Sequence, residues 1–138
     1  MKKIFLDTNI LLDVILKRRF YLQNSILVWS DCERKIIDGY VSAISLNNIH
    51  YILRKYVSSP RTLEYLKCIL NIFKIVPLDS TILYQAIDSP ERDFEDTIQI
   101  LSALQIKADC ILTRDIEHFK TQRIPIVVPA NYIKWRCG

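Results

Sequence analysis

Apolar residues along this chain form two kinds of pattern, short continuous runs and longer stretches with helical spacing. A continuous apolar run is typical of a buried strand, and apolar residues that recur every three or four positions are typical of one helix face. Continuous runs occur at residues 2–6, 40–44, 72–78, 108–113 and 124–128. Because these expected strands alternate with helical stretches, the pattern predicts a mainly parallel sheet of about five strands with helices on both faces.

Polar residues, glycine and proline set the expected ends of the helices. The expected helices cover residues 10–19, 24–37, 46–56, 63–71 and 80–87, and a further one begins at Asp93 to Asp96. Asp38-Gly39 is expected to stop the second helix, since glycine is common just after a helix end. Ser45 and Thr62 are expected to cap the third and fourth helices, and Ser58-Ser59-Pro60 to separate them. Pro77 predicts that the third strand lies at a sheet edge or ends there.

The composition indicates a single domain that spans residues 1–138. Half of the residues are apolar, and no repeat, low-complexity tract or linker interrupts them. The formal net charge of +4 and the pI of about 8.9 are compatible with a nucleic-acid partner. The chain has two glycines, Gly39 and Gly138, which excludes Gly-rich phosphate loops and dinucleotide fingerprints.

The sequence contains neither a membrane-segment pattern nor paired cysteines. Asp7, Asn9 and Asp13 interrupt any apolar core of a signal peptide. No window approaches the roughly 18 uninterrupted apolar residues of a membrane span. The four cysteines lack C-x-x-C spacing, which favours free thiols in a reducing compartment over a zinc site. We therefore expect a soluble, cytoplasmic protein without membrane contact.

Acidic residues stand at the ends of two expected strands and at the start of one expected helix. Asp7 follows the first strand, Asp115 follows the strand at 109–113, and Asp93 and Asp96 open the helix that enters that strand. Ligands of open parallel sheets bind beyond the carboxyl ends of the strands, so these acids are expected to converge if the two strands are neighbours. A carboxylate cluster raises its own pKa values, and Mg²⁺ or Mn²⁺ relieves that repulsion. Such an ion could activate water and stabilise a phosphoryl group.

The alternative for each acid is a structural one. A single Asp after a strand is more often a turn former, and Asp93 could simply cap its helix. Spacing alone leaves the metal site and the structural interpretation both open.

Three motifs resemble the PIN-domain family, and within it the small VapC-type toxins. They are FLDTNILLD, FEDTIQILSAL and ILTRDIEHF, in this order over nearly the whole chain. The resemblance implies a three-layer α/β/α fold. It also implies metal-dependent cleavage of RNA, often by the toxin of a toxin–antitoxin pair, and hence an RNA substrate, an antitoxin partner and a homodimer.

The resemblance also assigns residues to roles. Asp7, Asp96 and Asp115 match the acids that hold Mg²⁺ or Mn²⁺ and carry catalysis, and Thr113 matches a hydroxyl that supports a carboxylate. Two departures concern Asn48, where the family commonly has Glu, and His118, where it often has Asp. An amide can ligate a metal through its oxygen but brings no charge, and Asp93 or Glu95 could compensate as a further acid.

Residues beside these acids are expected to support the site or to contact RNA. Asn9 could orient Asp7 or cap the helix that follows. Lys17, Arg18 and Arg114 could contact phosphates, although the basic cluster could equally be a solvated helix end.

Two other functions remain open from the sequence. Asn48 and His118 favour a binding module that has kept the fold without the activity. An aspartyl-phosphate phosphatase also begins with an Asp after its first strand, but that chemistry usually needs D-x-D, and here Asn9 takes the third position.

Overall fold

A five-stranded, fully parallel sheet in the order β3-β2-β1-β4-β5 forms the centre of the computed structural model, which describes residues 1–89, 93–119, 121 and 123–138. The strands are β1 (Lys3–Leu6), β2 (Asp38–Ser42), β3 (Lys74–Val76), β4 (Cys110–Leu112) and β5 (Ile126–Val127). This arrangement confirms the predicted parallel sheet. It also confirms that the strand before Pro77 lies at an edge.

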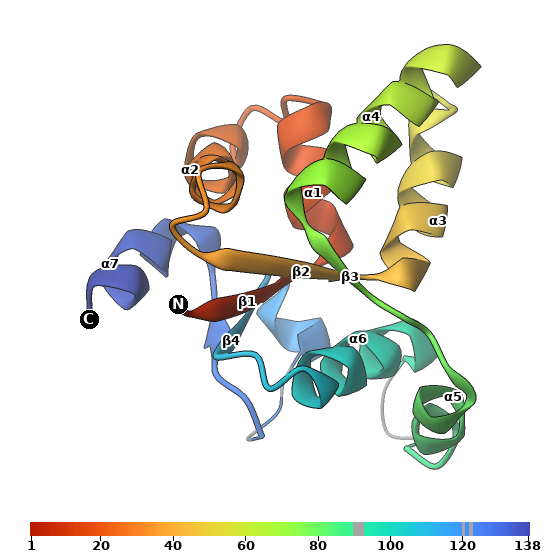
Figure 1. Ribbon diagram of the computed structural model, residues 1–138, viewed down its shortest axis with the longest axis vertical. Helices are drawn as coiled ribbons and strands as arrows, with labels where there is room; N and C mark the ends of the chain where they lie inside the picture. The colour runs from red at the N-terminus through yellow and green to blue at the C-terminus, as the bar shows by residue number, and fades with distance from the viewer. Residues whose placement is uncertain (90–92, 120, 122) are drawn as a thin grey trace.

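Helices cover both faces of the sheet and complete a three-layer α/β/α fold (Figure 1). The helices are α1 (Thr8–Ile15), α2 (Leu22–Glu33), α3 (Ala43–Leu53), α4 (Ser59–Ile72), α5 (Ser80–Ile87), α6 (Phe94–Gln105) and α7 (Tyr132–Cys137), with the 3₁₀ turns η1 (Ile116–Phe119) and η2 (Pro129–Asn131). Helices α1 to α4 cover one face, and α5 and α6 cover the other.

The alternation of side chains along the strands explains the two layers. On β1, Ile4 and Leu6 belong to the core beneath α1 to α4, whereas Phe5 points to the core beneath α6. On β4, Cys110 and Leu112 join the first core and Ile111 the second. Strands buried on both faces read as continuous apolar runs, which is why they were recognisable in the sequence.

The strand order places the expected acids together. From β1 the chain passes to β2 and β3 on one side, then returns to β4 and β5 on the other, so the order reverses at β1 and β4. Leu6 is paired with Leu112, and the backbone N–H of Asp7 donates to the carbonyl of Leu112 at 3.0 Å. The carboxyl ends of β1 and β4 therefore lie side by side, at the edge where ligands bind in such sheets.

The prediction that the second helix runs to residue 37 and stops at Asp38-Gly39 was wrong. Helix α2 ends at Glu33, Lys35 adopts φ 60°, and Asp38 and Gly39 begin β2. A Cβ atom at position 39 would lie 2.6 Å from the Sγ of Cys32 and 2.8 Å from a ring carbon of Phe73. Gly39 is therefore required by the close packing of β2 against Cys32 and Phe73 rather than by a helix end.

Two predicted caps also lie elsewhere. Helix α3 begins three residues earlier than expected after β2, with Ser42 as its cap, and Ser45 is instead buried and accepts a hydrogen bond from Thr8 at 2.7 Å. Helix α4 is capped by Ser58, so the Ser58-Ser59-Pro60 stretch starts the helix instead of breaking it. Proline fits there because the first helical turn needs no N–H donor. Thr62 lies inside α4 and donates its hydroxyl to the carbonyl of Ser58.

The C-terminal segment docks on the edge where the strands begin. Tyr132 is fully buried and donates its hydroxyl to Asp31 on α2 at 2.7 Å, while Arg136 pairs with the same carboxylate. The ammonium of Lys2 donates to the carbonyl of Trp135 at 3.1 Å and lies over its ring. Tyr132 and Trp135 therefore dock on the body of the protein.

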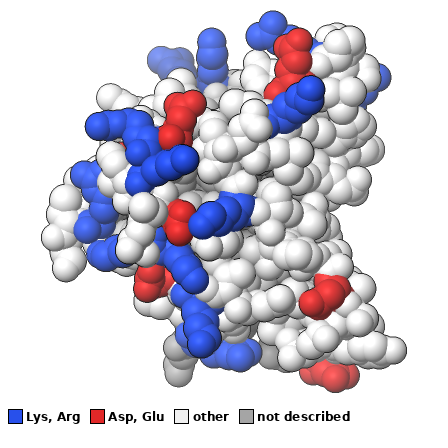
Figure 2. All heavy atoms as spheres, in the orientation of Figure 1, with Lys and Arg blue, Asp and Glu red and all other residues white. Residues whose placement is uncertain are grey.

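Positive charge is unevenly spread over the surface. Figure 2 shows Lys and Arg gathered on the left of the view, around α7 and α2, whereas the part over α5 is mainly uncharged or acidic. These Lys and Arg side chains lie towards the edge where the strands begin.

Among the described residues, no helix is long and apolar enough to cross a membrane.

Candidate active site

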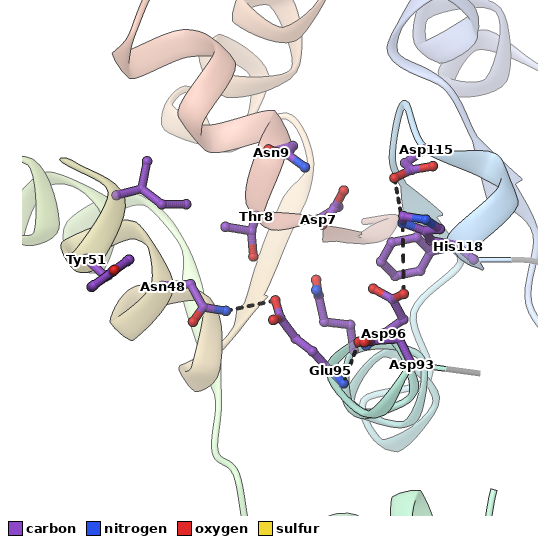
Figure 3. A pocket seen from close by; sticks show the side chains of 13 residues that line it. Asp7, Thr8, Asn9, Asn48, Tyr51, Asp93, Glu95, Asp96, Asp115 and His118 are labelled. Atoms are coloured by element: carbon purple, nitrogen blue, oxygen red, sulfur yellow. Dashed lines mark hydrogen bonds and ion pairs between the residues drawn. The ribbon is translucent and has the colours of Figure 1, made fainter. Parts of the chain in front are cut away.

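An open pocket of about 460 Å³ lies beyond the carboxyl ends of β1 and β4. Five acids line it: Asp7, Asp93, Glu95, Asp96 and Asp115. Asp7 follows β1, Asp115 follows β4, and the other three belong to the first turn of α6 and its cap, as Figure 3 shows. The structure therefore brings together all four acids that the sequence singled out.

Asp7 is the most buried acid of the pocket, with 4% of its surface exposed. Thr113 donates its hydroxyl to Oδ2 of Asp7 at 2.9 Å and accepts a hydrogen bond from the backbone N–H of Asp115 at 3.0 Å. This hydroxyl thus links the ends of β1 and β4, and it is the carboxylate support expected at this position. Burial raises the pKa of Asp7, which the hydrogen bond from Thr113 lowers in part and the charge of Asp115 raises further.

Asp115 and His118 form a pair on the side of the pocket that lies away from Asn48 and Tyr51. The Nδ1 of His118 lies 2.7 Å from Oδ2 of Asp115 and 4.0 Å from Oδ2 of Asp96. The 3₁₀ turn η1 brings His118 back over Asp115, three residues earlier. The imidazole of His118 therefore connects Asp115, which follows β4, with Asp96 on α6.

Asp96 lies in the first turn of α6 and faces the other carboxylates. Burial, followed by the charge of Asp93, raises the pKa of Asp96 to about 6. Asp7 and Glu95 also raise this pKa, whereas His118 lowers it. A carboxylate held among other acids is costly, and such a site favours either a proton or a cation.

Asp93 caps α6 while it lines the pocket. Its Oδ1 accepts hydrogen bonds from the backbone N–H groups of Glu95 at 2.9 Å and Asp96 at 3.2 Å. The structural interpretation of Asp93 as a helix cap is therefore correct. Its charge also acts on its neighbours, since it raises the pKa of both Glu95 and Asp96.

Asn48 and Glu95 meet across the pocket from helices α3 and α6. The Nδ2 of Asn48 donates to Oε1 of Glu95 at 2.8 Å, as the dashed line in Figure 3 shows. Glu95 thus brings a carboxylate next to the amide of Asn48. The sequence pointed to Glu95 only as a compensating acid and did not predict this contact.

The side chain of Asn9 contacts Arg18, and its backbone N–H lowers the pKa of Asp7. The Oδ1 of Asn9 accepts a hydrogen bond from Arg18 at 3.1 Å, and Arg18 also pairs with the buried Asp13. Arg114 contacts the same Asp13, with Nε at 2.9 Å from Oδ2. Of the three cations expected to contact RNA, Arg18 and Arg114 are therefore engaged in the fold, and Lys17 is exposed.

Asp13 is the buried acid that sequence reasoning missed. It is fully buried and lies between two guanidinium groups. The signal was present, since a charge within the apolar face of the α1 segment requires a partner. The sequence did not show which partner, because Arg114 lies 101 residues away.

The donor set fits a hydrated divalent cation rather than a closed metal cage. In residues 1–89, 93–119, 121 and 123–138, no three His, Cys, Asp or Glu side chains are grouped closely enough to hold a metal ion together. Mg²⁺ keeps several waters and usually binds one or two carboxylates, so an open group of acids suits it. The buried carboxylate of Asp7 and the acids around it supply the charge that such an ion needs.

A family model described as PIN domain matches residues 3–117. The chain belongs to the PIN-domain family. It is 26% identical over 119 residues to Ribonuclease VapC1 of Aquifex aeolicus (strain VF5), a match that covers 83% of this chain and 82% of that protein. The resemblance of the three sequence motifs is therefore confirmed.

Solved structures of similar fold include chains of two complexes. One is VapBC2 from Rickettsia felis bound to a DNA fragment from its promoter, with a TM-score of 0.69, 18% identity, and coverage of 91% of this chain and 98% of the matched chain. The other is a toxin–antitoxin complex from Klebsiella pneumoniae, with a TM-score of 0.69, 18% identity, and coverage of 91% and 96%. At these identities the likeness shows the PIN fold.

Proposed function

We propose that this PIN-domain protein is a metal-dependent endoribonuclease that hydrolyses RNA phosphodiester bonds, and that it is the toxin of a toxin–antitoxin pair. The observation that carries the proposal is the buried carboxylate of Asp7, which faces Asp96 and Asp115 in an open pocket and has a raised pKa. Such an acid calls for a bound cation, and a hydrated divalent cation is the common one for phosphodiester cleavage.

Asp7, Asp96 and Asp115 would hold Mg²⁺ or Mn²⁺ together with several bound waters, with Asp93 and Glu95 adding negative charge nearby. When bound, the ion supplies an activated water and offsets charge on the phosphoryl oxygens. The chain's own residues keep the acids in place. Thr113 fixes one oxygen of Asp7, and Nδ1 of His118 holds Asp115.

The toxin assignment rests on similarity and not on the pocket. The chain resembles a protein named Ribonuclease VapC1 and chains of VapBC-type complexes, so the proposed partner is a small antitoxin. Phosphate contacts by Lys17, Arg18 and Arg114, and a homodimer, remain predictions from the sequence. Co-expression of a short neighbouring reading frame should relieve growth arrest caused by this protein, if that frame encodes the antitoxin.

The nuclease is tested with a pool of labelled single-stranded RNAs in Mn²⁺, Mg²⁺ or EDTA. We expect cleavage that requires the metal and that the Asp96→Asn variant loses. Asp88→Asn, an exposed aspartate at the end of α5 and outside the pocket, is the matched control and should cut like the wild type. Wild-type cutting by Asp96→Asn, or equal cutting in EDTA, would contradict the proposal.

A binding module without catalysis is the second candidate, and two observations favour it. Asn48 brings an amide where the family commonly has an acid, and the imidazole of His118 is already paired with Asp115. Calorimetric titration with Mn²⁺ separates the two functions. Binding that the Asp7→Asn variant loses supports the nuclease, whereas no measurable binding supports the module.

A further inference from the structure

The pocket has a second wall whose chemistry differs from that of the catalytic acids. Asn48, Tyr51 and Ile52 line this wall from α3, and their spacing of three and four residues puts them on one helix face. In Figure 3, Asn48 and Tyr51 lie on the opposite side of Asp7 from Asp115 and His118. The pocket therefore offers an aromatic and amide surface beside its carboxylates.

Gln99 supplies the observation that points to a ligand. Its side chain lines the pocket, yet only 1% of the residue is exposed. Its Oε1 has no hydrogen-bond partner among the described residues. A buried carbonyl oxygen is normally hydrogen-bonded, so an unpaired one requires an explanation. An N–H donor from a molecule in the pocket would provide the missing bond.

Glu95 lies next to Gln99 and also accepts hydrogen bonds. The two residues are four apart on α6, and side chains at this spacing are neighbours on a helix surface. Oε1 of Glu95 accepts from Asn48 at 2.8 Å, and a carboxylate can accept several more hydrogen bonds. Glu95 and Gln99 thus place a carboxylate and a carbonyl on the same face of α6, and such a pair matches a ligand with two adjacent N–H donors.

The ring of Tyr51 offers a surface on which a flat ligand can stack. Tyr51 is 67% exposed although it lines the pocket, and the ammonium of Lys55 lies 4.8 Å from its ring centre. Proteins that bind single-stranded RNA commonly stack bases on such rings and read their pairing edges by hydrogen bonds. An aromatic face beside a pair of acceptors fits a nucleobase.

We propose that Asn48 and Tyr51 of this wall, together with Glu95 and Gln99 of α6, form a subsite for one nucleobase. Guanine is the base that this subsite prefers. Guanine carries adjacent N1–H and N2–H donors, which would reach the carboxylate of Glu95 and the carbonyl of Gln99 while the base stacks on Tyr51. The inference rests on the proposed function, since the base would belong to the RNA whose phosphodiester lies over the acids.

Nucleosides test the subsite without phosphate or metal, so that the result does not depend on metal binding by Asp7, Asp96 and Asp115. Guanosine, inosine and uridine are titrated into ¹⁵N-labelled protein in EDTA, and the side-chain amide signals of Gln99 and Asn48 are followed by NMR. We expect saturable shifts with guanosine, about tenfold weaker binding of inosine, which lacks the N2 amino group, and no saturation with uridine. Equal responses to the three nucleosides, or no response, would overturn the subsite.

Three variants connect the response to the wall. Gln99→Met keeps the length of the side chain without its polar atoms, and Tyr51→Ala removes the stacking surface. Both should lose the guanosine preference. Tyr56→Ala is the matched control, because Tyr56 is 66% exposed and does not line the pocket, and it should bind like the wild type. Loss of the preference in Tyr56→Ala, or its survival in Gln99→Met, would refute the assignment.

Stability provides a separate readout for Gln99. If the carbonyl is unpaired in the unliganded protein, Gln99→Met should melt at the same temperature as the wild type or higher, since an unsatisfied buried acceptor is removed. A lower melting temperature would show that Gln99 has a structural partner and would overturn the proposal.

Sequencing of the RNA ends left by cleavage separates the subsite from the nuclease. Guanosine binding without any metal-dependent cleavage would support the subsite and count against the proposed nuclease. Cleavage with no guanine preference, together with no guanosine response, would support the nuclease and overturn the subsite. Enrichment of guanine at a fixed distance from the cleavage site, if Gln99→Met abolishes it, would support both the subsite and the nuclease.

Discussion

Asp7 and Asp13 lie six positions apart in one short segment, are both buried, and have opposite surroundings. Asp13 is fully buried between Arg18 at 3.1 Å and Arg114 at 2.9 Å. Asp7 is 4% exposed, Thr113 donates a hydrogen bond to it, and burial and the charge of Asp115 raise its pKa. Two arginines balance the charge of Asp13 within the fold, whereas burial and a neighbouring acid disfavour the charge of Asp7, which a bound cation would offset. This difference separates a structural carboxylate from a candidate catalytic one.

The largest expected effect is the loss of RNA cleavage in Asp7→Asn. Removal of this carboxylate should lower the cleavage rate on the order of 1,000-fold, because several kcal/mol of metal-based charge stabilisation are lost. The melting temperature in EDTA should stay the same or rise, since a costly buried charge disappears. Cleavage assays and thermal melts of the same preparation check both parts. A variant that cuts normally, or one that fails to fold, would contradict this view of Asp7.

Asp13→Asn should show the reverse result, with a loss of stability as its main effect instead of a loss of cleavage. Removal of one partner from a buried ion pair leaves charge uncompensated, and we expect a loss of about 2–3 kcal/mol in the free energy of unfolding, given that both arginines are partly exposed. Urea denaturation measures this loss, and the exposed Asp88→Asn serves as the control. Unchanged stability of Asp13→Asn would mean that the comparison between the two aspartates is wrong.

The sequence predicted the positions of the acids because their placement follows from local rules. A carboxylate after a buried strand, together with a parallel sheet, puts Asp7 and Asp115 at one edge, and helix spacing adds Asp96. The partners of Asp13 and Glu95 could not be predicted in this way. They depend on which segments become neighbours, and the contact between Asn48 and Glu95 joins residues 47 positions apart.

Helix boundaries show the same limit. Gly39 looked like a helix end by composition, but the small space left by Cys32 and Phe73 decided its role. Ser42 and Ser45 are equally good caps by residue type and both are fully buried, but Ser45 accepts a hydrogen bond from Thr8 while Ser42 caps the helix. Local patterns thus predicted the order and type of the main elements, and tertiary packing determined their ends.

The pH dependence of the protein's stability tests whether the charges of the pocket acids are costly, as the comparison of Asp7 with Asp13 implies. The pKa of Asp96 is raised from 3.8 to about 6, so the folded protein binds this proton more tightly than the unfolded chain does. Asp96 therefore costs no stability below pH 4, and its cost grows as the pH rises from about 4 to 6. Because Asp96 is partly exposed, we expect Asp96→Asn to be about 1–2 kcal/mol more stable than the wild type above pH 6 in EDTA.

Urea denaturation of both proteins at pH 4, 5, 6 and 7 measures this difference. It should be absent at pH 4 and should reach its full size by pH 7. Saturating Mn²⁺ should reduce the difference at pH 7, because the ion stabilises the wild type more strongly. A constant difference at all four pH values would show that the charge of Asp96 is not its source.

The smallest expected effect concerns Arg114, which the sequence assigned to RNA and which the structure pairs with Asp13. Its guanidinium contacts both oxygens of Asp13, at 2.9 and 3.3 Å, and stacks 3.9 Å from the ring centre of Tyr21. Lysine keeps the charge but loses the two-point contact and the stacking, so Arg114→Lys should cost about 1 kcal/mol of stability. Cleavage at moderate salt should stay close to that of the wild type.

The salt dependence of RNA binding decides between the two roles of Arg114. A side chain that serves the fold leaves the slope of affinity against salt unchanged, whereas the loss of a phosphate contact reduces that slope by about one. Lys17→Gln is the matched variant, because Lys17 is an exposed cation of the same region. If Arg114→Gln and Lys17→Gln both reduce the slope, Arg114 contacts RNA as well as Asp13. If only Lys17→Gln does so, the buried Asp13 holds Arg114 for the fold, and the exposed lysine is the cation that binds the substrate.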